Sequence, residues 1–167
     1  MLEPPPPFLH PILDAIATHA AMTLPASPHA DDILHIATSY SLPFNLLRAQ
    51  IWVESTDDPY AFRYEHAFFE HYLRGKSTVK GAAYGPLAAC SLGLLQILLE
   101  TALEFGFNDR PEQLFVPRIG LEWGAKYLQH CLQRANGDYQ IGLRYYNGQG
   151  PQAEAYAARI WMLAGKV

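Results

Sequence analysis

The chain has 167 residues, of which 50% are hydrophobic and 17% are charged, and its formal net charge is -4. A chain of this length and composition buries enough apolar surface to fold as one domain, which excludes an intrinsically disordered protein. The negative charge, with no segment rich in Lys and Arg, argues against nucleic acid as a partner.

The beginning of the chain predicts an arm ahead of the folded domain. We expect residues 1–30 to form a proline-rich N-terminal arm with a short helix, because the prolines of residues 4–7 precede a helical apolar pattern over residues 8–22. This beginning has neither the positive charge nor the unbroken apolar segment of a secretory signal. No apolar stretch has the roughly 18 to 20 residues of a membrane span.

Residues 31–167 predict a single domain that is mainly helical, with little or no sheet. Apolar residues recur at helical spacing, and Pro, Asp or Gly marks several boundaries. The predicted helices are one that begins at His29 or Asp31, those over residues 44–54, 92–105, 118–134, 138–146 and 151–164, and shorter ones over residues 68–73 and from Asp109 to before Pro117. Residues 56–90 are the least regular part, with a loop over residues 75–86.

Cysteine and histidine spacing does not predict a metal site. Cys90 and Cys131 are too few for a disulfide scaffold, and we expect buried free thiols, although a bridge between them is an open alternative. His66 and His71 are five positions apart, so on a helix they do not face one ligand together.

Glu54 stands at the end of an apolar helical segment. Leu46, Leu47, Ile51 and Val53 precede it, so its helix must be largely buried. A carboxyl group in apolar surroundings resists ionisation and can keep a proton near neutral pH. This pattern predicts a proton donor, and the alternative is a capping or surface Glu at a helix end.

Three segments in order carry a family resemblance. They are residues 52–55 with Pro59 and Ala61 nearby, Ser-Leu-Gly-Leu-Leu-Gln-Ile at residues 91–97, and Tyr-Tyr-Asn-Gly at residues 145–148. Together they resemble the soluble-lytic-transglycosylase branch of the lysozyme superfamily, over roughly residues 33–163. The resemblance implies a lysozyme-like single domain of about seven to nine helices.

The same resemblance implies an enzyme that degrades peptidoglycan. It would cleave the β-1,4 bond between N-acetylmuramic acid (MurNAc) and N-acetylglucosamine (GlcNAc), and would form a 1,6-anhydro-MurNAc end. Glu54 matches the general acid/base of the family, and the glycan strand is the partner. No cofactor and no metal are implied.

The motifs also provide the expected substrate-binding residues, each with a structural alternative. Ser91 lies near the cleft in the family but can also cap a helix. Gly93 lets sugar or backbone approach closely. Gln96, on the helix expected beside the acid, can bind an N-acetyl group.

The C-terminal helices provide three more expected contacts. Tyr146 can hydrogen-bond near Glu54 or hold the acetamido group of the substrate, and Asn147 shapes the cleft wall. Tyr156 matches a family tyrosine that reaches back towards the cleft, with plain packing as the alternative.

The chain departs from the family pattern between Glu54 and Gln96, where it carries an insertion. In addition, Leu98-Leu99 replaces the usual Met-Pro after the second motif. Within the insertion, residues 63–69 resemble the Phe-Glu-x-His-x-Phe pattern of some phage muramidases, which makes Glu65 a second catalytic candidate. If Glu65 positions water, the reaction is hydrolysis; if it pairs with Arg63 or His66, it is structural.

The resemblance finally bears on where the protein acts. A cell-wall enzyme without a recognised export signal needs another route, which a phage or prophage origin provides. We expect a virion-associated protein, or one released to the bacterial periplasm and cell wall, whose arm contacts other virion proteins. The alternative is a non-enzymatic virion or secretion component with this fold.

Overall fold

The computed structural model describes residues 24–165 and is mainly helical, as predicted. Its helical elements are α2 (Ala30–Ser39), α3 (Phe44–Ser55), α4 (His66–Phe68), η1 (Phe69–Leu73), η2 (Ala82–Ala89), α5 (Leu99–Glu104), η3 (Pro111–Phe115), α6 (Pro117–Arg134), α7 (Tyr139–Asn147) and α8 (Pro151–Ala164). Residues 1–23 of the predicted arm, which include the predicted helix over residues 8–22, lie outside the described residues. No helix of the described part is long and apolar enough to cross a membrane.

Local sequence signals set most of the helix boundaries. Prolines occupy the first turn of η3, α6 and α8. Proline lacks a backbone N–H, and in the first turn of a helix this group would have no helical hydrogen-bond partner. Asp138 caps α7 by accepting a hydrogen bond of 2.9 Å from the backbone N–H of Ile141. The predicted boundaries of these helices are therefore confirmed within a residue or two.

A small antiparallel sheet lies where we predicted the least regular segment, residues 56–90, and the start of the helix over residues 92–105. Its strands are β1 (Phe62–Tyr64), β2 (Cys90–Leu92) and β3 (Ile97–Leu98), in the order β1-β2-β3. Arg63 pairs with Ser91, so these two side chains share one face of the sheet.

The predicted helix over residues 92–105 is wrong in its first half. Gly93 and Gln96 both have positive φ, 72° and 47°, which a continuous helix does not allow. The chain therefore turns between β2 and β3, and only Leu99–Glu104 is helical. The apolar residues at 92–97 are all buried, in a turn and in strands. A short, continuous buried segment has no periodicity that distinguishes a helix from a strand. Similarly, η2 occupies part of the predicted loop.

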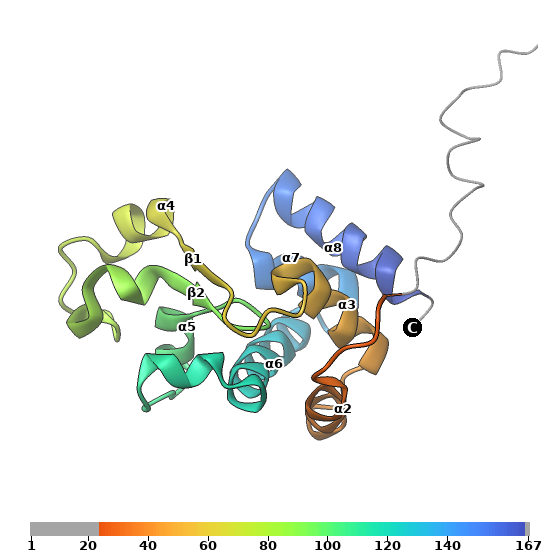
Figure 1. The fold of residues 1–167 in the computed structure, drawn as a ribbon. Helices are drawn as coiled ribbons and strands as arrows, with labels where there is room; N and C mark the ends of the chain where they lie inside the picture. Colours follow the sequence, from red (N-terminus) through yellow and green to blue (C-terminus); the bar gives the residue numbers. More distant parts are fainter. Residues whose placement is uncertain (1–23, 166–167) are drawn as a thin grey trace, which may run out of the picture.

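Two lobes share the long helix α6. The larger core lies among α2, α3, α6, α7 and α8, and a second core lies among the sheet, α5, η3 and the other face of α6. Figure 1 shows α6 near the middle, with β1, β2, α4 and α5 to one side and α2, α3, α7 and α8 to the other. Residues at the end of α3 and on the sheet therefore meet where the two lobes join.

Both cysteines are buried free thiols, as predicted. Burial raises the pKa of the Cys131 thiol to about 11, and it also raises the pKa of Cys90. Neither thiol is a reactive thiolate near neutral pH.

Candidate active site

Glu54 lies in the last turn of α3, half-buried at the boundary between the lobes. The helix ends directly after it, because Thr56 and Asp57 adopt positive φ values of 56° and 66°. Burial raises the pKa of the Glu54 carboxyl from 4.5 to about 7. The negative end of the α3 dipole acts in the same direction. Both the acid and its conjugate base are thus populated near neutral pH.

The phenol of Tyr156 binds Glu54 directly. Its hydroxyl donates to Oε1 of Glu54 at 2.5 Å, and the same hydroxyl oxygen accepts from Nε2 of Gln50 at 3.0 Å. Tyr156 comes from α8, which packs along α3, so the contact joins residues 102 positions apart in the chain. The predicted approach of Tyr156 to the acid is therefore present, as a hydrogen bond to the carboxyl itself.

Glu65 lies directly after β1, in the lobe that contains the sheet. Its Oε1 accepts from Nε of Arg63 at 2.5 Å and from Oγ of Ser91 at 3.0 Å. The nearby Arg63 lowers the pKa of Glu54, while the negative charge of Glu65 raises it. Strand β1 and the residue after it thus place both a cation and an anion next to Glu54, and their effects on its pKa oppose each other.

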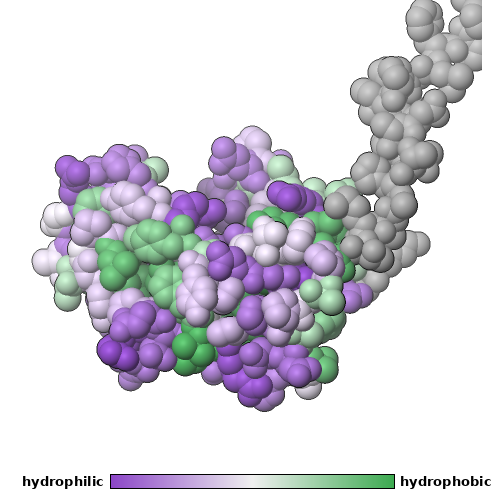
Figure 2. Space-filling model, viewed as in Figure 1, coloured by the Kyte–Doolittle hydropathy of each residue, from purple (hydrophilic) through white to green (hydrophobic). Residues whose placement is uncertain are grey.

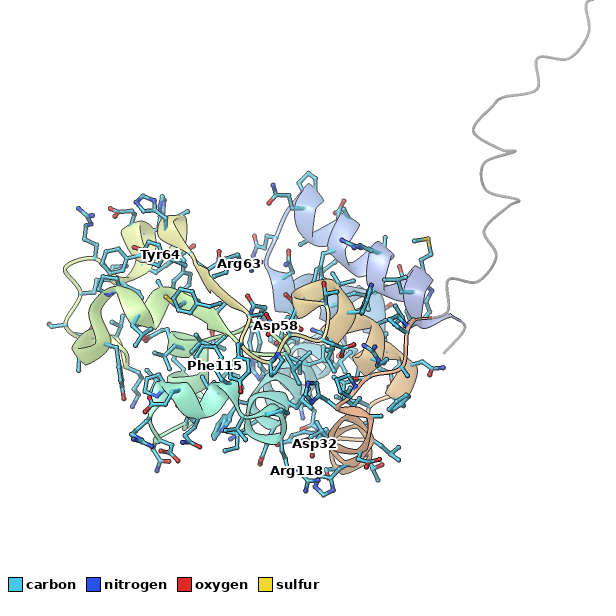
Figure 3. All side chains as sticks on the ribbon, in the orientation of Figure 1. Asp32, Asp58, Arg63, Tyr64, Phe115 and Arg118 are labelled. Carbon is cyan, nitrogen blue, oxygen red and sulfur yellow. The ribbon has the colours of Figure 1, made fainter. Side chains whose placement is uncertain are left out.

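The surface is hollowed at this boundary. Figure 2 shows a depression between the part of the molecule that carries α4 and the part that carries α8. In Figure 3, Arg63 lies beside this depression. Tyr64, the next residue of the strand, lies on the side of α4. Arg63 has a side chain 56% exposed, so it is open to a ligand in the depression.

Tyr146 lies beside the acid but does not donate to it. Its hydroxyl donates to the carbonyl oxygen of Leu95 at 2.8 Å, and its ring contacts that of Tyr127 at a centroid distance of 5.0 Å. Burial, and then the charge of Glu54, raises the pKa of this phenol well above its usual value. Tyr146 therefore supports the turn at residues 93–96, and Asn147, at the end of α7, is exposed.

The residues of the second motif mainly hold the backbone together. Ser91 is in β2 and not at a helix start, so the predicted cap is wrong, and its hydroxyl binds Glu65 instead. A Cβ at Gly93 would lie 2.4 Å from the carbonyl oxygen of Leu114, so the close approach there is by backbone. The amide nitrogen of Gln96 donates to the carbonyl oxygens of Ala61 and Gly93 at 2.9 and 3.0 Å. Substrate contacts by Ser91, Gly93 and Gln96 stay predictions.

The turn after Glu54 is fixed by a buried ion pair. Nη2 of Arg48 lies 2.5 Å from Oδ2 of Asp57, with side chains only 8% and 10% exposed, and it also donates to the carbonyl oxygen of Pro25 at 2.8 Å. Ser27 donates to the other oxygen of Asp57 at 2.9 Å. Asp58 accepts from the backbone N–H of Tyr60, as expected of a turn residue.

Three buried polar residues were missed at the level of sequence. Arg48, Gln50 and Glu100 are 6%, 0% and 3% exposed. Glu100 accepts from the backbone N–H groups of Lys80 and Gly81 at 2.8 and 2.6 Å, which ties the insertion to α5. Gln50 could have been found, because it is a polar residue one helical turn before Glu54 within an apolar run.

Other features of the described residues do not add to this site. No cluster of three or more His, Cys, Asp or Glu that could hold a metal occurs among residues 24–165. Two grooves, of about 330 and 500 Å³, are lined by other residues and include none of the predicted site residues.

The protonation of Glu54 predicts a pH dependence of activity. A reaction that needs the protonated carboxyl should lose rate as pH rises through about 7, because the acid form is depleted there. The measurement is kcat/KM of that reaction as a function of pH. A descending limb near pH 4.5, the ordinary value for Glu, would show that burial does not keep the proton on Glu54.

The chain matches a family model in sequence and a solved structure in fold. The family model described as Transglycosylase SLT domain matches residues 32–161. A similar solved structure is the X-ray structure of an inactive mutant of the lytic transglycosylase Slt from Pseudomonas aeruginosa, with a TM-score of 0.60 and 19% sequence identity. This likeness is one of fold, and it covers 82% of this chain and 23% of that chain. A comparison with curated protein sequences gives no match.

Proposed function

The chain belongs to the transglycosylase SLT domain family, and from this premise we propose that it is a lytic transglycosylase acting on peptidoglycan. The bond cleaved is the β-1,4 bond between MurNAc and GlcNAc. The observation that carries the proposal is Glu54, a half-buried carboxyl with a pKa of about 7, at the boundary between the helical lobe and the lobe that contains the sheet.

Glu54 serves twice in the proposed reaction. Protonated Glu54 first gives its proton to the oxygen that links the two sugars, while the bond from this oxygen to the anomeric carbon of MurNAc breaks. Ionised Glu54 then removes the proton of the C6 hydroxyl of MurNAc, whose oxygen attacks the anomeric carbon. The 1,6-anhydro ring closes, Glu54 regains its proton, and no water is consumed.

The pKa of Glu54 suits both steps. A carboxyl with a pKa near the working pH can donate and accept a proton with little loss in either direction. The nucleophile is part of the substrate, so its proximity replaces a bound water and a second catalytic carboxylate. The other carboxyl of the site, Glu65, is therefore not required by this mechanism.

A hydrolytic muramidase is the second candidate, and Glu65 is the observation that favours it. This carboxylate lies close enough to Glu54 to affect its pKa, and Ser91 and Arg63 hold it in place. As a general base, Glu65 would take a proton from water, and the water oxygen would attack the anomeric carbon. The ion pair with Arg63 supports a structural role for Glu65 instead.

Product analysis separates the two reactions. We expect digestion of purified peptidoglycan to give anhydro-muropeptides, which are one water lighter than reducing ends in mass spectrometry. The variant Glu65→Gln should give the same products, with a rate within about tenfold of the parent, because only an electrostatic effect on Glu54 is lost. Reducing-end products that disappear in Glu65→Gln would establish the hydrolase instead.

The place of action belongs to the same proposal. We propose action on the bacterial cell wall by a phage- or prophage-encoded protein, either carried in a virion or released to the periplasm. The N-terminal arm, residues 1–30, is the proposed contact with other virion proteins. A non-enzymatic virion or secretion component with this fold is the remaining alternative, and failure of the purified protein to cleave peptidoglycan would favour it.

A further inference from the structure

Gln50 is a fully buried amide in the hydrogen-bond chain that ends on Glu54. It is 0% exposed and lies one turn before Glu54 on α3, so both side chains face α8. Its Nε2 donates to the hydroxyl of Tyr156 at 3.0 Å, and Tyr156 donates to Oε1 of Glu54 at 2.5 Å. The amide carbonyl of Gln50 has no hydrogen-bond partner among the described residues.

The two hydrogen bonds that link Gln50, Tyr156 and Glu54 run in one direction, because a phenol has a single hydrogen to donate. A hydroxyl has one hydrogen to donate, and an NH2 group can only donate. While Gln50 donates to the oxygen of Tyr156, the single hydrogen of Tyr156 is free for Glu54. Oε1 of Glu54 therefore receives a hydrogen bond in both of its charge states, and the acid proton belongs on Oε2.

We propose that Gln50 is a positioning residue which, through Tyr156, fixes the oxygen of Glu54 that carries the catalytic proton. The inference rests on the proposed acid/base role of Glu54. If Tyr156 instead pointed its hydrogen elsewhere, protonated Glu54 would have to donate its own proton to Tyr156 to keep the short contact. That proton would then face Tyr156 on α8 and would be withheld from the substrate.

The variant Gln50→Met tests the proposal, because Met has a similar length but no donor. We expect kcat to fall about tenfold, the usual effect of one neutral hydrogen bond, with KM unchanged because Gln50 is buried. The hydrogen bond from Tyr156 lowers the pKa of Glu54, so weakening it should move the descending limb of the pH profile to higher pH. The other groups that face Glu54 (Arg63, Glu65 and Tyr146) are unchanged in this variant.

A double-variant cycle shows whether Gln50 acts through Tyr156. The variant Tyr156→Phe should also move the descending limb of the pH profile to higher pH. Gln50→Met combined with Tyr156→Phe should move the limb no further than Tyr156→Phe alone. The matched control is Gln129→Met, since Gln129 donates to the carbonyl oxygen of Tyr40 on the other side of the larger core. Its kcat and pH profile should equal those of the parent.

Thermal unfolding distinguishes positioning from support of the fold. A buried amide with an unpaired carbonyl contributes little to stability, so Gln50→Met should unfold at the same or a higher temperature than the parent. A lower unfolding temperature, with a loss of rate that is equal at every pH, would assign Gln50 a structural role and overturn the proposal.

A titration of Glu54 keeps this test separate from the proposed function. Glutamate labelled with ¹³C at the carboxyl carbon reports the pKa of Glu54 without any substrate, and we expect a higher value in Gln50→Met. If the parent does not cleave peptidoglycan, the proposed function fails, whatever the titration gives. If the parent cleaves it, and Gln50→Met matches the parent in rate and in Glu54 titration, the role of Gln50 fails alone.

Discussion

Replacing Glu54 with Gln should slow the cleavage of purified peptidoglycan by a factor of about 100 to 10,000, the usual contribution of a general acid or base. The carboxamide keeps the shape of the side chain and can still accept from Tyr156, but it cannot deliver a proton to the leaving oxygen. The measurement is the release of soluble muropeptides per unit time at saturating substrate.

The fold of this variant can be checked independently. In the parent, the pKa of Glu54 lies at about 7, above its ordinary value of 4.5, so ionising the buried carboxyl destabilises the folded state. This penalty grows from pH 4.5 upwards and is complete above pH 7. Glu54→Gln lacks it and should be at least as stable as the parent at about pH 8.

A surface carboxylate provides the matched control for activity. Glu112 is 56% exposed and pairs with Arg110 at 3.3 Å, so Glu112→Gln should cleave peptidoglycan at the parental rate. Unchanged cleavage by Glu54→Gln, at parental stability, would remove Glu54 from the mechanism and with it the proposed function.

The second large effect is expected from Arg48→Met, which should lower the free energy of unfolding by about 3 to 5 kcal/mol. The substitution leaves Asp57 as a carboxylate 10% exposed, with the hydroxyl of Ser27 as its remaining side-chain partner among residues 24–165. It also removes the bond from Arg48 to the carbonyl oxygen of Pro25. Denaturant unfolding at neutral pH gives the value.

An exposed ion pair is the appropriate comparison for Arg48→Met. Arg118 lies 2.8 Å from Asp32, but the two side chains are 53% and 30% exposed, so Arg118→Met should cost at most about 1 kcal/mol. Similar losses in both variants would mean that the pair of Arg48 and Asp57 is as solvated as a surface pair. Its role in fixing the turn after Glu54 would then be small.

Much of the helical lobe could be predicted from sequence, because its signals act within one or two turns. Pro117, Asp138 and Pro151 set helix starts through their own backbone and side-chain chemistry, whatever packs against them. The sheet could not be predicted. Its strands are two or three residues long, and the turn that lets β2 pair with β3 depends on positive φ at Gly93 and Gln96 rather than on an alternating pattern.

The candidate site divides in the same way. The apolar helix that ends at Glu54 is visible in the sequence and already indicates a carboxyl that holds its proton. The direction in which Gln96 and Tyr146 point is not visible, and both donate to backbone carbonyls instead of to the acid. A motif fixes which residue types are present, but the turn between β2 and β3 and the packing of α7 decide which way Gln96 and Tyr146 face.

The sequence by itself determined the helical class, the family resemblance and the candidate acid, since each depends on residues close together along the chain. Only the tertiary structure decided that Tyr156 and Gln50 hold one oxygen of Glu54, that Glu65 pairs with Arg63, and that Arg48 supports the turn behind the acid. The physical reason is distance along the chain. Hydrogen bonds and ion pairs have strict limits of length and angle, so a contact between residues 102 positions apart exists only once helices α3 and α8 are packed.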